Sequence, residues 1–216
     1  TEQAIFMKEG IPVKSIEHPA PDAKYSGDGG KTLNDNKGGI LSLQSKTWLG
    51  FLMDTITFTI AVNKKQAVQS VLFQLLQDYN SWIFFPDKAE VYCNMDGVMQ
   101  KQGEMFFAKV ENKDTKLVQP FVIPFGKTVR TDLVQLRIYT CSKIPDWHAG
   151  KGQKGWLFID ELKIYDIPLT DQQVWERYKA TTTAPTLLFP GNDSTLINPW
   201  PTVILDWDST VTATSY

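Results

Sequence analysis

The sequence has few of the residues from which metal and redox sites are most often built. It contains two cysteines and two histidines among 216 residues. Cys93, Cys141, His18 and His148 lack the short paired spacing of a zinc site, so we expect none. Two cysteines form one disulfide or none, so the sequence leaves the pairing of Cys93 and Cys141 open.

A surplus of charge and long apolar runs are also missing. The chain has 22 Lys and Arg against 24 Asp and Glu, for a net charge of -2. This balance gives no electrostatic reason to expect nucleic acid or an anionic lipid surface as a partner. No apolar run approaches the roughly 18 residues that a membrane helix needs, so we expect no membrane span.

Positive charge disappears altogether from Ala184 onward, where the remaining charges are Asp193, Asp206 and Asp208. This shift in composition predicts a linker at 181–184 and a new unit at 185–216. The new unit has strand-like patterns at 185–190 and 202–207. About thirty residues are too few to bury a core alone, so we expect the first part of a second β-sandwich.

Residues 1–180 are predicted to form an all-β unit. At 55–62 apolar residues alternate with threonines, which is typical of a strand with one buried face. Further strands are expected at 68–76, 88–94, 103–111, 119–125, 133–141 and 156–165. Turns are expected at 63–65, 96–97 and 112–114. Thr170 and Gln173 fit a capping box, which predicts one short helix at 171–179. Strands without intervening helices favour a sandwich or jelly roll.

No set of residues suggests catalysis. Asp160 and Glu161 are adjacent acids, but neighbouring side chains of a strand are expected to point to opposite faces. Two carboxylates on opposite faces cannot flank one scissile bond. Residues 126–128 resemble the end of a phosphate loop, but its first glycine is replaced by Phe121. A fragment with enzymatic activity is therefore the least favoured of three hypotheses.

The segment 28–39 is rich in glycine and in side chains with oxygen donors, which suits calcium. Its spacing does not match an EF-hand. An ordinary loop stabilised by Asp and Asn side chains explains the same composition, so both interpretations stay open at this point.

Among the seven tryptophans, Trp147 stands out because it lies in a polar loop beside Asp146 and His148. A stacking ring with a hydrogen-bond acceptor and donor is suited to binding a sugar. The alternative is a plug, in which Trp147 folds back over the end of the sandwich. Trp82 is similarly ambiguous, whereas the apolar strand contexts of Trp48 and Trp156 predict core positions.

Six segments of the chain together resemble the discoidin-like domain that follows the catalytic barrel of family 20 β-N-acetylhexosaminidases. They are 24–35 with 47–51, 76–78, 81–86, 145–152 and 155–162. The wider family is the coagulation factor 5/8 C-domain, or galactose-binding-like, jelly roll, which includes family 32 carbohydrate-binding modules. The tail from Pro185 resembles the start of a fibronectin type III-like domain. The catalytic motif of the hexosaminidases is absent from this chain.

The resemblance implies a secreted or cell-surface location and a structural Ca²⁺ ion. Carried over to this chain, its ligands are expected at Asp35, Asn36, Gly38 and Glu161, although Asp35-Asn36 departs from the usual Asp-Gly. The expected function is a non-catalytic carbohydrate-binding module of a larger secreted glycoside hydrolase. Ligand contacts are expected at Trp147, His148, Asp146 and Trp82. Expected partners are a glycan, ending in galactose or an N-acetylhexosamine, and the remainder of the parent polypeptide. The alternative is a structural spacer that packs on a catalytic domain and binds nothing.

Overall fold

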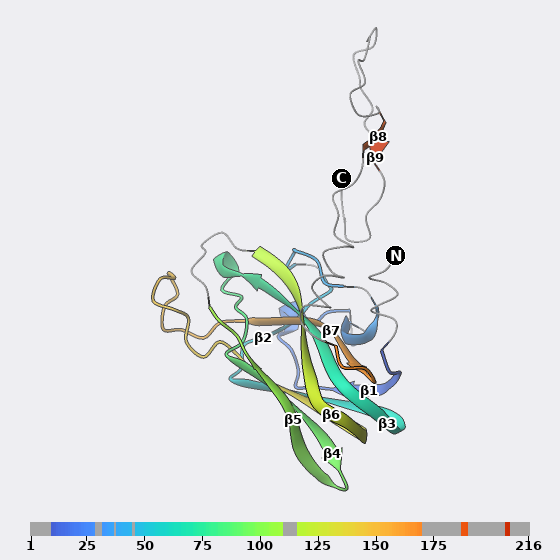
Figure 1. Ribbon diagram of the computed structural model, residues 1–216. Coiled ribbons are helices and arrows are strands. Elements are labelled where there is room, and N and C mark those ends of the chain that lie inside the picture. Colours follow the sequence, from blue (N-terminus) through green and yellow to red (C-terminus); the bar gives the residue numbers. More distant parts are fainter. Residues whose placement is uncertain are drawn as a thin grey trace.

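Two long strands organise the described part of the chain. This computed structural model describes residues 10–28, 32–36, 38–44, 46–109 and 116–169, and the backbone of two short strands at 187–189 and 206–207. β3 (Thr55–Asp78) and β6 (Lys116–Tyr139) pair antiparallel along almost their whole length, side by side in Figure 1. Each half of this pair has different neighbours, so the pair belongs to two layers.

The first layer combines the first half of β3 and the second half of β6 with β1 (Val13–Glu17), β4 (Lys88–Met95) and β5 (Val98–Phe106). The second layer combines the other halves with β7 (Leu157–Tyr165) and β2 (Leu49–Phe51). Side chains of both layers meet in one core cluster, which includes Phe58, Leu136, Phe73 and Ile159. The fold is therefore an all-β sandwich, as the sequence predicts.

The two layers differ in what covers their outer faces. In the first half of β3, Ile56, Phe58 and Ile60 are fully buried, and the threonines between them are more exposed. In the second half every residue from Ser70 to Asp78 is buried. The alternation is lost there because both faces of the second layer are covered.

The second layer is covered by the segment that precedes β2. Trp48 is fully buried there, and its indole nitrogen donates a hydrogen bond to the carbonyl oxygen of Ile40 at 2.8 Å. It packs with Leu76, Val118 and Phe158 in a second apolar cluster. The core position predicted for Trp48 is confirmed, and its hydrogen bond holds the backbone of Ile40 against this layer.

Several predicted strand boundaries are wrong. The strands expected at 55–62 and 68–76 are one strand, β3, and the turn expected at 63–65 is only a shift in its register with β6. The strands expected at 119–125 and 133–141 are likewise joined in β6. β5 begins at Val98 rather than at residue 103. β1 and β2 were not anticipated, whereas the turn at Asp96 and Gly97 is confirmed.

The tail contains two short strands, β8 (Leu187–Phe189) and β9 (Asp206–Trp207), which pair antiparallel. They lie within the two strand-like patterns expected there. The helix expected at 171–179 and the turn expected at 112–114 lie outside the described residues. Within the described ranges, no helix is long and apolar enough to cross a membrane.

Candidate functional site

Two connections meet at one end of the sandwich. The connection from β3 to β4 contains η3 (Tyr79–Ser81), and the connection from β6 to β7 spans residues 140–156. The backbone amide of Trp156 donates to the carbonyl of Trp82 at 2.9 Å, and the amide of Phe84 donates to the carbonyl of Trp156 at 3.1 Å. These hydrogen bonds hold the two connections side by side.

The loop that carries Trp147 is closed by its own backbone. The amide of Ile144 donates to the carbonyl of Gln153 at 2.7 Å, and the amide of Gly152 donates to the carbonyl of Ile144 at 2.9 Å. Trp147 is half-buried, and its ring lies 5.0 Å from the ring of Tyr79, between centroids. Part of the indole therefore remains open to solvent, while part packs on the protein.

His148 is held by two hydrogen bonds inside the protein. Its Nδ1 accepts from the backbone amide of Gly150 at 3.0 Å, so the proton of the neutral ring is on Nε2. Nε2 then donates to the carbonyl oxygen of Tyr79 at 2.9 Å. Both ring nitrogens are thus used internally, and His148 is suited to positioning the loop rather than to donating to a ligand.

Trp82 also lies near His148, with 6.2 Å between the two ring centroids. Its backbone is left-handed, with φ of 61°, at the end of η3. The indole packs against Gly150, where a Cβ atom would lie 3.1 Å from the ring. Trp82 is half-buried, and its glycine neighbour is what allows the ring to approach so closely.

The structure brings all four predicted contact residues to this end of the molecule. Asp146 is exposed, so its carboxylate is free to accept hydrogen bonds from solvent or ligand. Two further aromatics, Tyr25 and Trp156, are half-buried, with 5.4 Å between their ring centroids, and they pack against the separate apolar cluster that contains Phe158. The sequence pattern missed both, since Tyr25 lies in an irregular segment and Trp156 directly precedes a buried strand. Trp156, predicted to be core, is only partly buried.

The predicted metal ligands lie elsewhere, on the outer face of β7. Glu161 has a left-handed backbone, with φ of 43°, and is an extra residue in the pairing of β7 with β3. Ile159 and Leu162 both belong to the main core, so Asp160 and Glu161 both lie on the opposite face. The expectation that these two acids point to opposite faces is therefore wrong, and the β-bulge is the reason.

Three of the four predicted ligands come together around Lys163, which is only 4% exposed. Its Nζ donates to Asn36 Oδ1 at 2.7 Å and lies 3.2 Å from Glu161 Oε2. Burial raises the pKa of Glu161 to about 7. The charge of Lys163 opposes this rise, and a hydrogen bond with Asp35 adds to it. Gly38 lies instead beside the side chain of Gln74.

Asp160 adds a further buried carboxyl to this face. Neither of its oxygens has a hydrogen-bond partner of ordinary geometry within the described part of the chain. Burial, followed by the charge of Glu161, raises the pKa of Asp160 to about 9. Its carboxyl is therefore protonated at neutral pH, and the charge on this face is smaller than the count of acids suggests.

The oxygen atoms of the predicted ligands show whether the expected Ca²⁺ ion fits this site. Asn36 Oδ1 and Glu161 Oε2, two of the expected ligand atoms, already bind an ammonium group. Among the described residues, no group of three or more His, Cys, Asp or Glu side chains is arranged to hold a metal ion. This arrangement does not match a metal centre built from the four expected residues, and Ca²⁺ stays a prediction.

The described part of the chain also contains a cavity and two buried thiols away from these loops. A cavity of about 300 Å³ lies between β1 and the turn at 32–36, and its lining includes Lys14, His18 and Asp35. Cys93 and Cys141 are both buried and unpaired, so neither contributes a disulfide. Burial raises the pKa of the Cys93 thiol to about 12, which keeps it protonated and unreactive.

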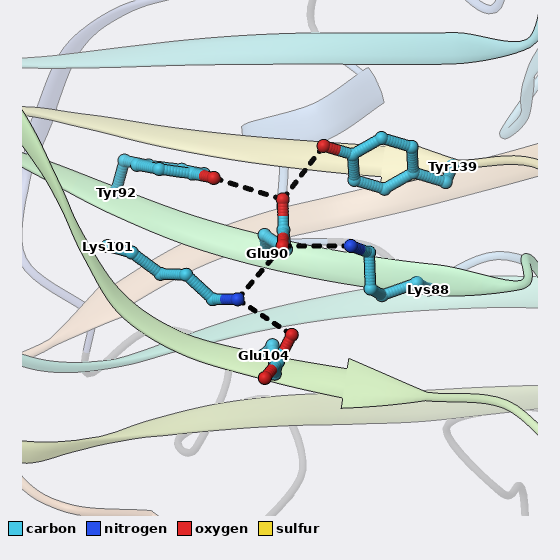
Figure 2. A network of polar contacts seen from close by, with 6 residues as sticks. All are labelled: Lys88, Glu90, Tyr92, Lys101, Glu104 and Tyr139. Atoms are coloured by element: carbon cyan, nitrogen blue, oxygen red, sulfur yellow. Dashed lines mark hydrogen bonds and ion pairs between the residues drawn. The ribbon is translucent and has the colours of Figure 1, made fainter.

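A polar network occupies the outer face of the first layer (Figure 2). Oε1 of the buried Glu90 accepts from Nζ of Lys88 and of Lys101, both at 2.9 Å. Its Oε2 accepts from the hydroxyls of Tyr92 at 3.0 Å and Tyr139 at 2.8 Å. Because every donor points at one carboxylate, this network ties strands β4, β5 and β6 together and leaves Glu90 no capacity for a ligand.

Known structures give distant likenesses to this chain. No family model matches the sequence, and no curated protein is similar to it. A family 32 carbohydrate-binding module from Streptococcus pneumoniae EndoD has 14% identity and a TM-score of 0.47, covering 72% of this chain and 95% of that one. The module from C. perfringens NanJ, in complex with galactose, has 13% identity and a TM-score of 0.45, covering 69% and 91%.

A Ruminococcus gnavus GH29 fucosidase in complex with fucose has 10% identity and a TM-score of 0.44. The match covers 74% of this chain but only 26% of the fucosidase. The family 32 modules belong to the class that the sequence itself resembles. TM-scores below 0.5 at these identities do not support an inference about function, which has to come from the residues of this chain.

Proposed function

We propose that this chain is a non-catalytic glycan-binding module and that its ligand binds at the loops that carry Trp82 and Trp147. The observation that carries the proposal is the pair of half-exposed indoles packed near the ring of His148, with the exposed Asp146 beside them. The C–H face of a sugar stacks on an aromatic ring, and its hydroxyl groups need fixed polar partners. Both requirements are met within one closed loop.

Each residue has a distinct role in this proposal. Trp147 is the stacking platform, and Asp146 accepts hydrogen bonds from sugar hydroxyls. Trp82 forms a second apolar wall, while His148 holds the loop through Gly150 and Tyr79. The proposed ligand is a glycan that ends in galactose or an N-acetylhexosamine. The proposed setting is a secreted or cell-surface glycoside hydrolase related to the β-N-acetylhexosaminidases.

Calorimetric titration with galactose, N-acetylgalactosamine and N-acetylglucosamine tests the proposal. A single site of this kind is expected to bind with a Kd of roughly micromolar to millimolar, or about 4–8 kcal/mol. Trp147→Ala should abolish binding of whichever sugar responds. Phe106→Ala is a matched control, because Phe106 is an exposed aromatic on β5, outside these loops. Equal binding by the wild type and Trp147→Ala would rule out this site.

A structural spacer is the second candidate function, and one observation favours it. Trp147 packs against a buried cluster of Tyr79, Phe84, Cys141 and Ile144, as a plug would. The two functions differ in how indole fluorescence responds to acrylamide. Binding predicts that a saturating sugar protects part of the fluorescence from quenching. A spacer predicts the same quenching with and without each sugar.

A further inference from the structure

Lys163 is an unusual residue in this molecule because its charge is buried, on the outer face of β7 beside the turn at 32–36. Its side chain is 5% exposed, and that of its partner Glu161 is fully buried. Lysine is almost never fully buried unless its ammonium group is paired, because removing the charge from water is costly. The position of Lys163 therefore requires partners, and the structure provides them from two separate parts of the chain.

The two partners lie far apart in sequence. Glu161 is the bulge residue on β7, and Asn36 lies in the turn that follows η2 (Thr32–Asn34). Asn36 has a left-handed backbone, with φ of 61°. The contact from Lys163 Nζ to Asn36 Oδ1, at 2.7 Å, joins residues 127 positions apart. The ammonium group is thus the link between this turn and the last strand of the sheet.

We propose that the Lys163 ammonium is the resident cation of this site, and that the fold needs no metal ion there. The distances of 2.7 and 3.2 Å are those of hydrogen bonds and ion pairs from nitrogen to oxygen. A calcium ion would need six to eight oxygen ligands at 2.3–2.6 Å, and would compete with the ammonium for the same two oxygen atoms. The ammonium group of Lys163 provides the link that a calcium ion would provide, because it joins the turn at 32–36 to β7.

Thermal unfolding of the full chain with excess EDTA or excess CaCl₂ tests the proposal directly. The expected result is the same Tm in both solutions, to within about 1 °C. A site that binds calcium at 100 times its Kd would be stabilised by about 2.7 kcal/mol, which raises Tm by roughly 5–10 °C. A rise of that size, reversed by EDTA, would overturn the proposal whatever the behaviour of any variant.

A variant measures the contribution of the ammonium group itself. In EDTA, Lys163→Met keeps the apolar stem but leaves Asn36 and Glu161 without their cation, so its Tm should fall by roughly 5–15 °C. Lys127→Met is the matched control, because Lys127 is exposed on β6 and its loss should leave Tm nearly unchanged. Equal Tm values for the two variants would contradict the proposal. Failure of Lys163→Met to fold, with Lys127→Met folding normally, would support it.

Discussion

At the scale of single residues, Glu90 shows how this fold accommodates a buried charge. It is 5% exposed and accepts hydrogen bonds from two lysines and two tyrosines. Burial raises the pKa of its carboxyl, but these four donors outweigh burial and lower the pKa to about 2. Since the ordinary value is 4.5, the folded state holds the ionised form more strongly than the unfolded state does.

This difference predicts how stability depends on pH. The contribution of Glu90 is fully present above about pH 4.5 and is lost as the pH falls toward 2, where the folded protein also takes up the proton. Glu90→Gln should be less stable than the wild type by about 1–3 kcal/mol at pH 7. Urea unfolding of both proteins between pH 7 and 3 measures the difference, which should shrink below pH 4.5. A difference that grows at low pH would contradict this assignment.

The candidate site shows which residues a sequence can predict. The half-exposed position of Trp147 was predictable, because an indole in a polar, glycine-rich loop lacks the apolar neighbours of a core position. The hydrogen bonding of His148 inside the protein was not predictable, because it depends on the carbonyl of Tyr79, 69 residues away. The sequence also could not predict that Asp160 and Glu161 lie on the same face, because the β-bulge that places them there depends on the register of β7 with β3.

At the scale of elements, the longer strands were predictable, including the fully buried β7 expected at 156–165, whereas the short strands β1 and β2 were not. The threonine alternation at 55–62 marks the first half of β3. β2 has only three residues, all buried, so no alternation can appear. Pro120 and Pro124 lie inside β6, where this half of the strand pairs with β3 alone. Proline is tolerated on such an edge because no second neighbour needs its missing N–H.

The hairpin between β4 and β5 offers a test of turn chemistry. Asp96 and Gly97 both have positive φ, of 51° and 89°, as a two-residue turn of this kind requires. Gly97→Ala should destabilise the protein by about 1–2 kcal/mol, because alanine is strained at this φ. This loss of stability comes from the backbone conformation and not from a steric clash, because no atom lies within 4 Å of the added Cβ. Urea unfolding measures it.

Gly126→Ala is the matched control for this turn. Gly126 also has no atom within 4 Å of an added Cβ, and its φ is not positive. Gly126→Ala should lower the free energy of unfolding by less than Gly97→Ala does, or even raise it. If the two variants are equally stable, the backbone conformation of the hairpin turn is not what constrains residue 97.

At the scale of the whole molecule, the described residues of the sandwich already form an extensive core among themselves. The buried residues of all four apolar clusters lie between Leu33 and Leu169. We therefore propose that the unit predicted at 185–216 is separate from the sandwich. A chain that ends at residue 184 should have the same Tm as the full chain, within about 2 °C, in a thermal scan. A loss of more than about 5 °C would show that the tail is part of the folding unit.

The central claim concerns the loops at the end of the sandwich, and one measurement tests it most directly. It is the calorimetric titration of galactose, N-acetylgalactosamine and N-acetylglucosamine into the wild type, Trp147→Ala and Phe106→Ala. We predict saturable binding of at least one sugar by the wild type and by Phe106→Ala, and none by Trp147→Ala. If no sugar binds the wild type, or if Trp147→Ala binds as the wild type does, the proposed site is contradicted.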